Sequence, residues 1–190
     1  MSATDTPTRL LDTAQALIQE RGYNAFSYKD LAAAVGIRTA SIHYHFPSKA
    51  DLGLALMGRY QEQLEQALGA IDQKGRSAKG KLKAFIQMYR DTASQGAICL
   101  CGSLATDRET LPETLQEAVA AYLDRSEAWV AERVAAGVKE GEFDYGGKPA
   151  DAAASLVSSL QGGLILARAT HGTQRLESLQ RVFLTTLGSA

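Results

Sequence analysis

Residues 27–49 read SYKDLAAAVGIRTASIHYHFPSK and carry the strongest local structural signals in the chain. Two short segments with helical spacing flank Gly36, and glycine at such a bend accepts a positive φ without the steric cost of a Cβ atom. Ser27 followed by Asp30 is the pattern of a helix N-terminus, and Pro47 blocks continuation of the second segment. Two short helices joined by a tight turn are predicted here, which is a helix-turn-helix arrangement.

The second of these helices has one apolar and one polar face. Four apolar residues are expected to pack between the two helices and the one before them: Val35, Ile37, Ile42 and Phe46. The exposed face is expected to carry Thr39, Ser41, His43, Tyr44 and His45. A polar helix face of this kind fits the DNA major groove, with its N-terminal residues nearest the base edges. The alternative is three packed helices whose polar surface has no partner.

The pair His43 and His45 also suggests a metal site. Residues at positions i and i+2 of a helix point away from each other, so these two imidazoles do not share an ion easily. We expect no metal and no cofactor.

Outward from this stretch, the remaining chain shows helical spacing of apolar residues and no convincing strand pattern. The predicted helices cover residues 8–20, 48–71, 81–94, 98–105, 112–141, 150–170 and 173–187. The sequence therefore predicts an all-α protein of about nine helices, in which the fourth is long, roughly 36 Å at 1.5 Å per residue.

The composition is that of a folded globular protein. The 190 residues are 45% hydrophobic and 22% charged, with a net charge of −1, which excludes a disordered chain and a strongly basic coat. The longest uncharged run, residues 152–167, is shorter than a membrane span, and the first residues lack the apolar core of a secretion signal. We expect a soluble cytoplasmic protein. No Ser/His/Asp order, phosphate-binding loop, HExxH or CxxC motif suggests an enzyme.

Residues 8–60 resemble the TetR family of bacterial transcriptional regulators. The resemblance is carried by LAAAVGI at residues 31–37 and, most specifically, by IHYHFPSKADL at residues 42–52. It implies a DNA-binding domain over residues 1–52 and a helical ligand-binding and dimerisation domain over residues 53–190. It also implies a homodimeric repressor that a small ligand or an electrophile releases from a palindromic operator. The alternative is an adaptor that uses the helix-turn-helix to bind protein.

The resemblance also implies roles for individual residues of the DNA-binding domain. Base reading is implied for Arg38, Ala40 and Ser41. Contacts with the DNA backbone are implied for Ser27, Tyr28, Thr39, Tyr44, His45 and Lys49. His43 stands where the family more often has Tyr, so its DNA contact is expected to be weaker or pH-sensitive.

The expected roles in the second domain also follow from the resemblance. Ligand contacts are expected from Phe85, Met88, Tyr89, Tyr122, Trp129 and Gln161. The last two helices are expected to form the dimer interface through Leu156, Leu160, Leu164, Leu179, Val182 and Phe183. The alternative for these two helices is an ordinary core within one chain.

Cys99 and Cys101 lie on a short apolar segment inside the expected ligand-binding domain. One interpretation makes both of them small buried apolar side chains. The other interpretation makes one of them a thiolate that takes part in ligand recognition by sensing electrophiles or oxidants. Such a thiolate requires a lowered cysteine pKa and access to solvent.

Overall fold

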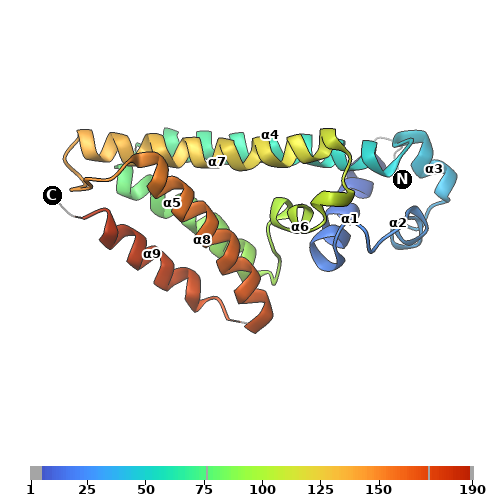
Figure 1. Ribbon diagram of the computed structural model, residues 1–190. Helices are drawn as coiled ribbons and strands as arrows, with labels where there is room; N and C mark the ends of the chain where they lie inside the picture. Colours follow the sequence, from blue (N-terminus) through green and yellow to red (C-terminus); the bar gives the residue numbers. More distant parts are fainter. Residues whose placement is uncertain (1–5, 76, 171, 189–190) are drawn as a thin grey trace. The chain divides into compact units, whose positions relative to one another are not determined.

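The computed structural model describes residues 6–75, 77–170 and 172–188, and over these ranges the chain forms nine α-helices, one 3₁₀ turn and no strand (Figure 1). The helices are α1 (Thr6–Arg21), α2 (Tyr28–Val35), α3 (Thr39–His45), α4 (Lys49–Gln73), α5 (Ala78–Ser94), α6 (Leu100–Thr106), α7 (Glu113–Lys139), α8 (Pro149–Thr170) and α9 (Gln174–Thr186), and the 3₁₀ turn is η2 (Arg108–Thr110). The predicted all-α class is confirmed.

The chain packs into two compact units. Unit 1 consists of Met1–Gln63 and Leu100–Ala121, and unit 2 consists of Leu64–Cys99 and Tyr122–Ala190. The helices α4 and α7 each contribute residues to both units. Residues 100–121 therefore pack in the same unit as the N-terminal helices, although they are far from the helix-turn-helix in the sequence.

The local signals in residues 27–49 are confirmed. The Ser27 side chain caps α2 and Asp30 completes a capping box, while Gly36 ends the helix with φ 75° and donates its N–H to Ala32 O. Val35, Ile42 and Phe46 are buried as predicted, whereas Ile37, which was also expected in the core, is half-buried. Helix α2 packs against both α1 and α3, and the outer face of α3 is exposed.

Helix α6 packs on α1 within unit 1. The buried Ser103 hydroxyl donates to Ile18 O at 2.7 Å, near the end of α1. A buried hydroxyl with a partner avoids the cost of an unsatisfied polar group, so this bond ties α6 to one position on α1.

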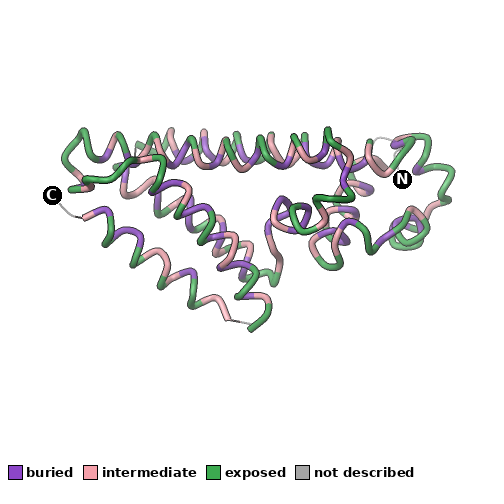
Figure 2. Tube along the Cα trace, in the orientation of Figure 1, coloured by how far each residue is buried: buried purple, intermediate pink, exposed green. Residues whose placement is uncertain are grey.

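Unit 2 is organised around α8, which packs against α5 and α9. A Cβ atom added to Gly163 would lie 2.7 Å from the Leu176 side chain, so a larger residue there would displace Leu176 where α8 and α9 approach each other. Figure 2 shows buried and exposed positions alternating along these helices, as expected for amphipathic helices on a core. By length and composition α8 could cross a membrane, but eight of its residues, Leu160 among them, are buried in the protein core.

Candidate nucleic-acid interface

Helix α3 presents a polar, exposed face. Tyr44 is 84% exposed, although it is a large aromatic residue. The predicted surface residues that are also exposed are Arg38, Thr39, Ala40, Ser41 and His43, while His45 is half-buried. A groove along this face is lined by Thr6, Ile37, Arg38, Ala40, Ser41, Tyr44 and His45. The structure therefore brings the predicted base-reading residues together on one surface.

Tyr28 connects the start of α2 to the junction between α3 and α4. Its hydroxyl lies 2.9 Å from Phe46 O and also within reach of Ser48 O, so one hydrogen is shared between two carbonyl oxygens. Burial, reinforced by the charge of Asp51, raises the pKa of Tyr28 to about 12. Tyr28 is thus a neutral donor at any physiological pH, and it positions the end of α3.

His43 is oriented by two neighbours. Its Nδ1 lies 3.0 Å from Pro47 O, and its ring packs edge-on against Tyr28 with 4.9 Å between centroids. A hydrogen on Nδ1 makes the first contact a hydrogen bond, which leaves Nε2 as the nitrogen directed to an outside partner.

Ser27 uses its hydroxyl within the protein. Its Oγ lies 2.6 Å from Asp30 Oδ2, and its N–H donates to the same carboxylate oxygen at 2.7 Å. The hydrogen bonds from Ser27 lower the pKa of Asp30 below its usual value. Ser27 is therefore first of all the cap of α2.

The Lys49 ammonium points into unit 1. It donates to Tyr23 O and Phe26 O and lies 4.5 Å and 4.1 Å from the centroids of these two aromatic rings. Burial lowers the pKa of Lys49, and the charges of Asp107 and Asp30 oppose this effect. Two of the three N–H groups of the Lys49 ammonium are thus bonded to carbonyl oxygens of its own chain, and its expected contact with the DNA backbone stays a prediction.

Two basic residues of unit 1 did not stand out in the sequence. Arg9 donates to Val35 O at 2.8 Å and ties α1 to the end of α2. Lys29 is exposed in the first turn of α2, beside Tyr28. A single lysine in a short amphipathic helix carries no distinctive signal, so only the placement of α2 makes Lys29 a candidate phosphate contact.

Aromatic residues expected to contact a ligand lie in the core of unit 2. Phe85 stacks on Trp129 at 5.4 Å between centroids, and it packs against Tyr89 at the same distance. Tyr122 is also buried, and Met88 is half-buried. Gln161 is half-buried, and its Nε2 is shielded from solvent and meets no hydrogen-bond partner among the described residues.

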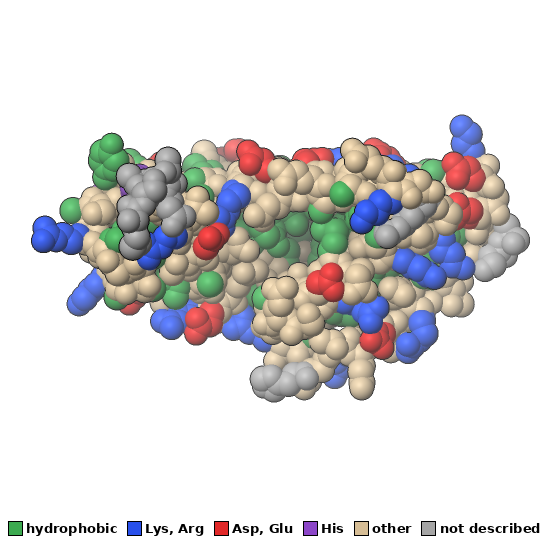
Figure 3. Space-filling model, turned by 180° about the vertical axis from the view of Figure 1, so that it is seen from behind, with side chains coloured by type: hydrophobic (Ala, Val, Ile, Leu, Met, Phe, Trp, Pro, Cys, Tyr) green, Lys and Arg blue, Asp and Glu red, His purple; other side chains and the backbone are tan. Residues whose placement is uncertain are grey.

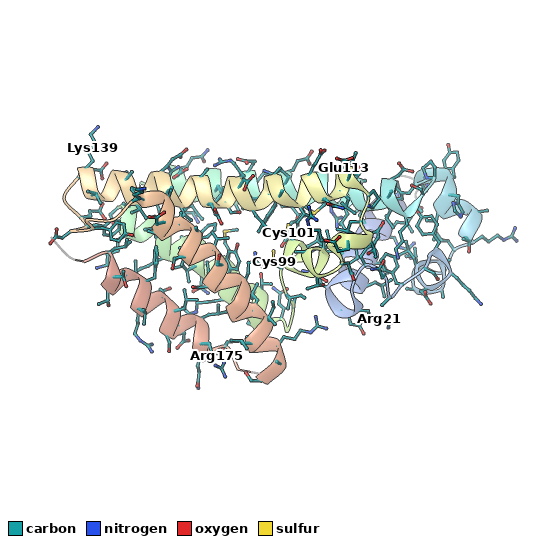
Figure 4. The ribbon with its side chains drawn as sticks, in the orientation of Figure 1. Arg21, Cys99, Cys101, Glu113, Lys139 and Arg175 are labelled. Carbon is teal, nitrogen blue, oxygen red and sulfur yellow. The ribbon has the colours of Figure 1, made fainter. Side chains whose placement is uncertain are left out.

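The two cysteines fall in different units. Cys99 is the last residue of the segment Leu64–Cys99 of unit 2, whereas Cys101 lies in the first turn of α6 in unit 1 (Figure 4). Their exposed fractions are 4% and 0%. A reagent therefore reaches either sulfur only when the surrounding helices open.

The residues expected at the dimer interface divide into two groups. Leu156, Leu160 and Leu164 are buried inside unit 2 of a single chain, which leaves Leu160 and Leu164 no surface for a partner subunit, whereas Leu156 also lines a groove between α8 and α9. The apolar surface of Leu160 and Leu164 is already covered by helices of the same chain. Exposed apolar side chains on α8 and α9 are instead those of Ile165, Leu166 and Val182.

A groove of about 170 Å³ lies between α8 and α9, and of these three exposed side chains it is lined by Val182. Its lining includes Ser155, Ser159, Leu179, Val182 and Phe183. Four of the six residues expected at the interface, Leu156, Leu179, Val182 and Phe183, therefore border one open, partly apolar surface.

The protein surface mixes both signs of charge. The face drawn in Figure 3 shows Lys and Arg interspersed with Asp and Glu, in keeping with the net charge of −1. Among the described residues no group of three or more His, Cys, Asp or Glu side chains is placed to hold a metal ion.

Comparisons with known proteins match both parts of the chain. Residues 10–56 match the family described as bacterial regulatory proteins, tetR family, and residues 78–183 match the tetracyclin repressor-like C-terminal domain. The KstR2 transcriptional repressor of Rhodococcus jostii is 29% identical over 143 residues, which are 72% of this chain and 67% of the relative.

Solved structures resemble the whole chain. A TetR-family regulator from Agrobacterium tumefaciens is 29% identical with a TM-score of 0.93, and the similarity covers 100% of both chains. A TetR regulator from Legionella pneumophila is 34% identical with a TM-score of 0.86, over 98% of this chain and 100% of that one. From these matches and the geometry of α2 and α3, the chain belongs to the TetR family, whose members are DNA-binding transcriptional regulators rather than enzymes.

Proposed function

We propose that this regulator is a cytoplasmic repressor that binds a palindromic operator as a homodimer and leaves it when an effector binds unit 2. The observation that carries the proposal is the exposed polar face of α3, held on a buried three-helix core. Two such helices in a dimer reach successive major grooves when they lie about 34–36 Å apart, which is one turn of DNA. The name of the Rhodococcus relative, a transcriptional repressor, favours repression over activation.

Within this proposal, the N-terminal end of α3 reads the bases. Arg38, Ala40 and Ser41 are exposed at that end, where an arginine can bond guanine and a methyl group can pack on thymine. Thr39, His43, Tyr44 and His45 then contact the DNA backbone, together with Lys29. Tyr28, Ser27 and Lys49 act mainly by fixing α2, α3 and the start of α4, because their polar groups bond within the chain.

The effector site we propose lies by the aromatic cluster of Phe85, Tyr89 and Trp129, with Gln161 as its polar group. The unpartnered Gln161 Nε2 supports this assignment, because a buried donor without an acceptor costs free energy that a ligand oxygen would restore. An apolar molecule with at least one hydrogen-bond acceptor is the class of ligand that these residues would bind. A thiol trigger at Cys99 or Cys101 is the second candidate, favoured by the position of both residues where the chain passes between the units.

For the dimer, we propose the outer face of α8 and α9. The exposed side chains of Ile165, Leu166 and Val182 and the adjoining groove support this choice, because apolar surface of this kind gains from being covered.

Selection of duplexes from a random-sequence pool tests the proposed function. The protein is expected to retain duplexes with two inverted half-sites whose centres are about 10 base pairs, or a multiple of this, apart. Binding is expected to weaken steeply as salt is raised, since phosphate contacts release counterions. A protein that retains no duplex at any salt concentration is not a DNA-binding repressor, and the adaptor alternative then stands.

A further inference from the structure

The α1–α2 turn, residues 22–26, connects the first helix to the helix-turn-helix. Gly22 ends α1 with φ 92° and donates its N–H to Ile18 O. The turn that follows exposes backbone amides and carbonyls that no helix satisfies, and side chains from two other parts of unit 1 bond to them.

Asp107, between α6 and η2, holds the amide side of the turn. Its Oδ2 accepts the Tyr23 N–H at 2.7 Å and the Asn24 N–H at 3.4 Å, while its Oδ1 accepts from Asn24 Nδ2 at 3.0 Å. Thr110 adds a fourth contact, because its Oγ1 lies 2.7 Å from Asn24 Nδ2. A carboxylate that accepts backbone N–H groups makes strong, charge-assisted hydrogen bonds.

Lys49, in the first turn of α4, holds the carbonyl side of the same turn. Its ammonium bonds Tyr23 O and Phe26 O. Tyr23 is thus held at its N–H by an anion and at its C=O by a cation. The charge of Asp107 also favours the protonated form of Lys49 and so raises its pKa against the effect of burial.

Lys49 is connected to the end of α3 through the backbone and the Tyr28 hydroxyl. Ser48 precedes Lys49 in the chain, and its carbonyl oxygen accepts from the Tyr28 hydroxyl, as does Phe46 O at the end of α3. A displacement of the α1–α2 turn therefore moves both the start of α2 and the end of α3, which are the elements that the proposed DNA contact needs.

We infer that Asp107 is a positioning residue for the DNA-binding surface: it holds the α1–α2 turn in place against Lys49 and so sets the orientation of α3, without touching DNA. The inference rests on the proposed function, because it assumes that α3 binds DNA. It makes operator affinity depend on residues 100–110, which lie outside the residues 10–56 that match the N-terminal family. The hydroxyl bond from Ser103 to Ile18 O fixes the same segment on α1.

The sign of the effect distinguishes this role from simple electrostatics. Removing an acidic group from a DNA-binding unit lowers its repulsion of phosphates, so DNA binding should strengthen or stay unchanged. Positioning by Asp107 requires the opposite result. Glu109 is the matched control, because it is an acid two residues away whose side chain is 91% exposed and pairs only with the adjacent Arg108 among the described residues.

The experiment compares Asp107→Ala, Asp107→Asn, Asn24→Ala and Glu109→Ala, all as full-length chains. The probe is the duplex that the wild-type protein selects from a random pool, and the assay temperature is one at which circular dichroism shows every variant folded. Asp107→Ala is expected to bind about tenfold more weakly, which is the scale of one charge-assisted hydrogen bond. Asn24→Ala removes only the side-chain hydrogen bonds to Asp107 and Thr110. Its affinity for the duplex, and that of Asp107→Asn, are expected to lie between those of wild type and Asp107→Ala.

Two further readouts separate positioning from a lost DNA contact or a lost fold. The slope of affinity against salt is expected to stay at the wild-type value, because no phosphate contact is removed. Amide hydrogen exchange in the free protein is expected to speed up at Tyr23 and Asn24 in Asp107→Ala but not in Glu109→Ala.

An Asp107→Ala protein that binds the selected duplex as tightly as wild type, or more tightly, overturns the inference even if exchange at Tyr23 accelerates. Equal losses in Asp107→Ala and Glu109→Ala overturn it as well. A wild-type protein that selects no duplex is a different outcome, because it overturns the proposed function on which the inference rests.

Discussion

Trp129 on α7 donates its indole N–H to Asp72 near the end of α4, with 3.0 Å between Nε1 and Oδ2. Arg133 donates to both oxygens of the same carboxylate at 3.0 Å and 2.6 Å, and its guanidinium also lies over the Trp129 ring. Lys81 of α5 completes the group with an ion pair of 3.4 Å. One half-buried carboxylate thus joins three helices of unit 2 to the aromatic cluster proposed as the effector site.

The first prediction concerns acid stability. Burial by itself raises the pKa of Asp72, but the hydrogen bonds from Arg133 and Trp129 and the Arg133 charge outweigh it and lower the pKa to about 2. Because this folded-state pKa is below the usual value of 3.8, ionised Asp72 stabilises the fold above about pH 4, and the contribution is lost as the pH falls towards 2. Asp72→Asn is expected to reduce stability by about 2 kcal/mol near neutral pH and by less at pH 2.

Trp129 supplies the measurement, since it is the chain's one tryptophan and its fluorescence follows unfolding of unit 2. Thermal unfolding of wild type and Asp72→Asn is compared from about pH 5 to pH 2. A stability difference that stays constant over this range contradicts the role given to the Asp72 charge.

The second prediction concerns the exposed face of α3. Tyr44→Ala is expected to weaken binding of the selected duplex about tenfold, or 1.4 kcal/mol, with no change in melting temperature, because the ring packs on no core residue. Val138→Ala, an exposed apolar position in unit 2, is the control and is expected to change neither quantity. Unchanged duplex affinity in Tyr44→Ala removes Tyr44 from the proposed interface.

The third prediction separates Lys49 from Lys29. Lys49→Ala leaves two carbonyl oxygens without their donor, so the protein is expected to lose about 1–3 kcal/mol of stability while its salt slope for DNA binding stays constant. Lys29→Ala is expected to leave stability unchanged and to lower the salt slope by about one per bound subunit. A lower slope in Lys49→Ala would show that its ammonium leaves the turn to bind phosphate.

The fourth prediction concerns the dimer. Val182 is 65% exposed on α9, so Val182→Arg is expected to leave the chain folded but monomeric in sedimentation at micromolar concentration. Ala135→Arg, at an exposed position of α7, is the control and is expected to stay dimeric. Leu164→Arg is expected to unfold the chain instead, because Leu164 is buried within it. A monomeric wild-type protein contradicts the proposed interface outright.

The fifth prediction concerns the cysteines. Because Cys99 and Cys101 are buried, their alkylation by N-ethylmaleimide is expected to be slow in the folded protein and fast in urea. If the thiols are the trigger, a quinone releases the selected duplex from wild type but not from the Cys99→Ser, Cys101→Ser double variant. Equal release from both proteins identifies the effector as a molecule that does not react with these thiols.

The local structure of residues 27–49 follows from the amino-acid sequence alone. Ser27 with Asp30, Gly36 and Pro47 act on backbone atoms within a few residues, so their consequences can be predicted without the rest of the chain. The apolar pattern that buries Ile42 also determines that Tyr44 is exposed, because a helix has a fixed angle between successive residues. For these reasons the all-α class and the exposure of Thr39, Ser41, His43 and Tyr44 on α3 were predicted correctly, whereas His45 is half-buried.

Contacts between residues far apart in the chain depend on the packing of the helices and could not be predicted. Asp107 bonds a residue 84 positions earlier, and a single aspartate in a connecting segment gives no pattern that predicts this. An apolar stripe shows that Leu160 is buried, but burial against the same chain and burial against a partner subunit require the same residues, so the sequence could not separate them. Lys49 illustrates the same limit for charged side chains, because a lysine after a helix can bind either phosphate or a carbonyl oxygen. Only the packing of the α1–α2 turn against α4 brings the carbonyl oxygens of Tyr23 and Phe26 to its ammonium group.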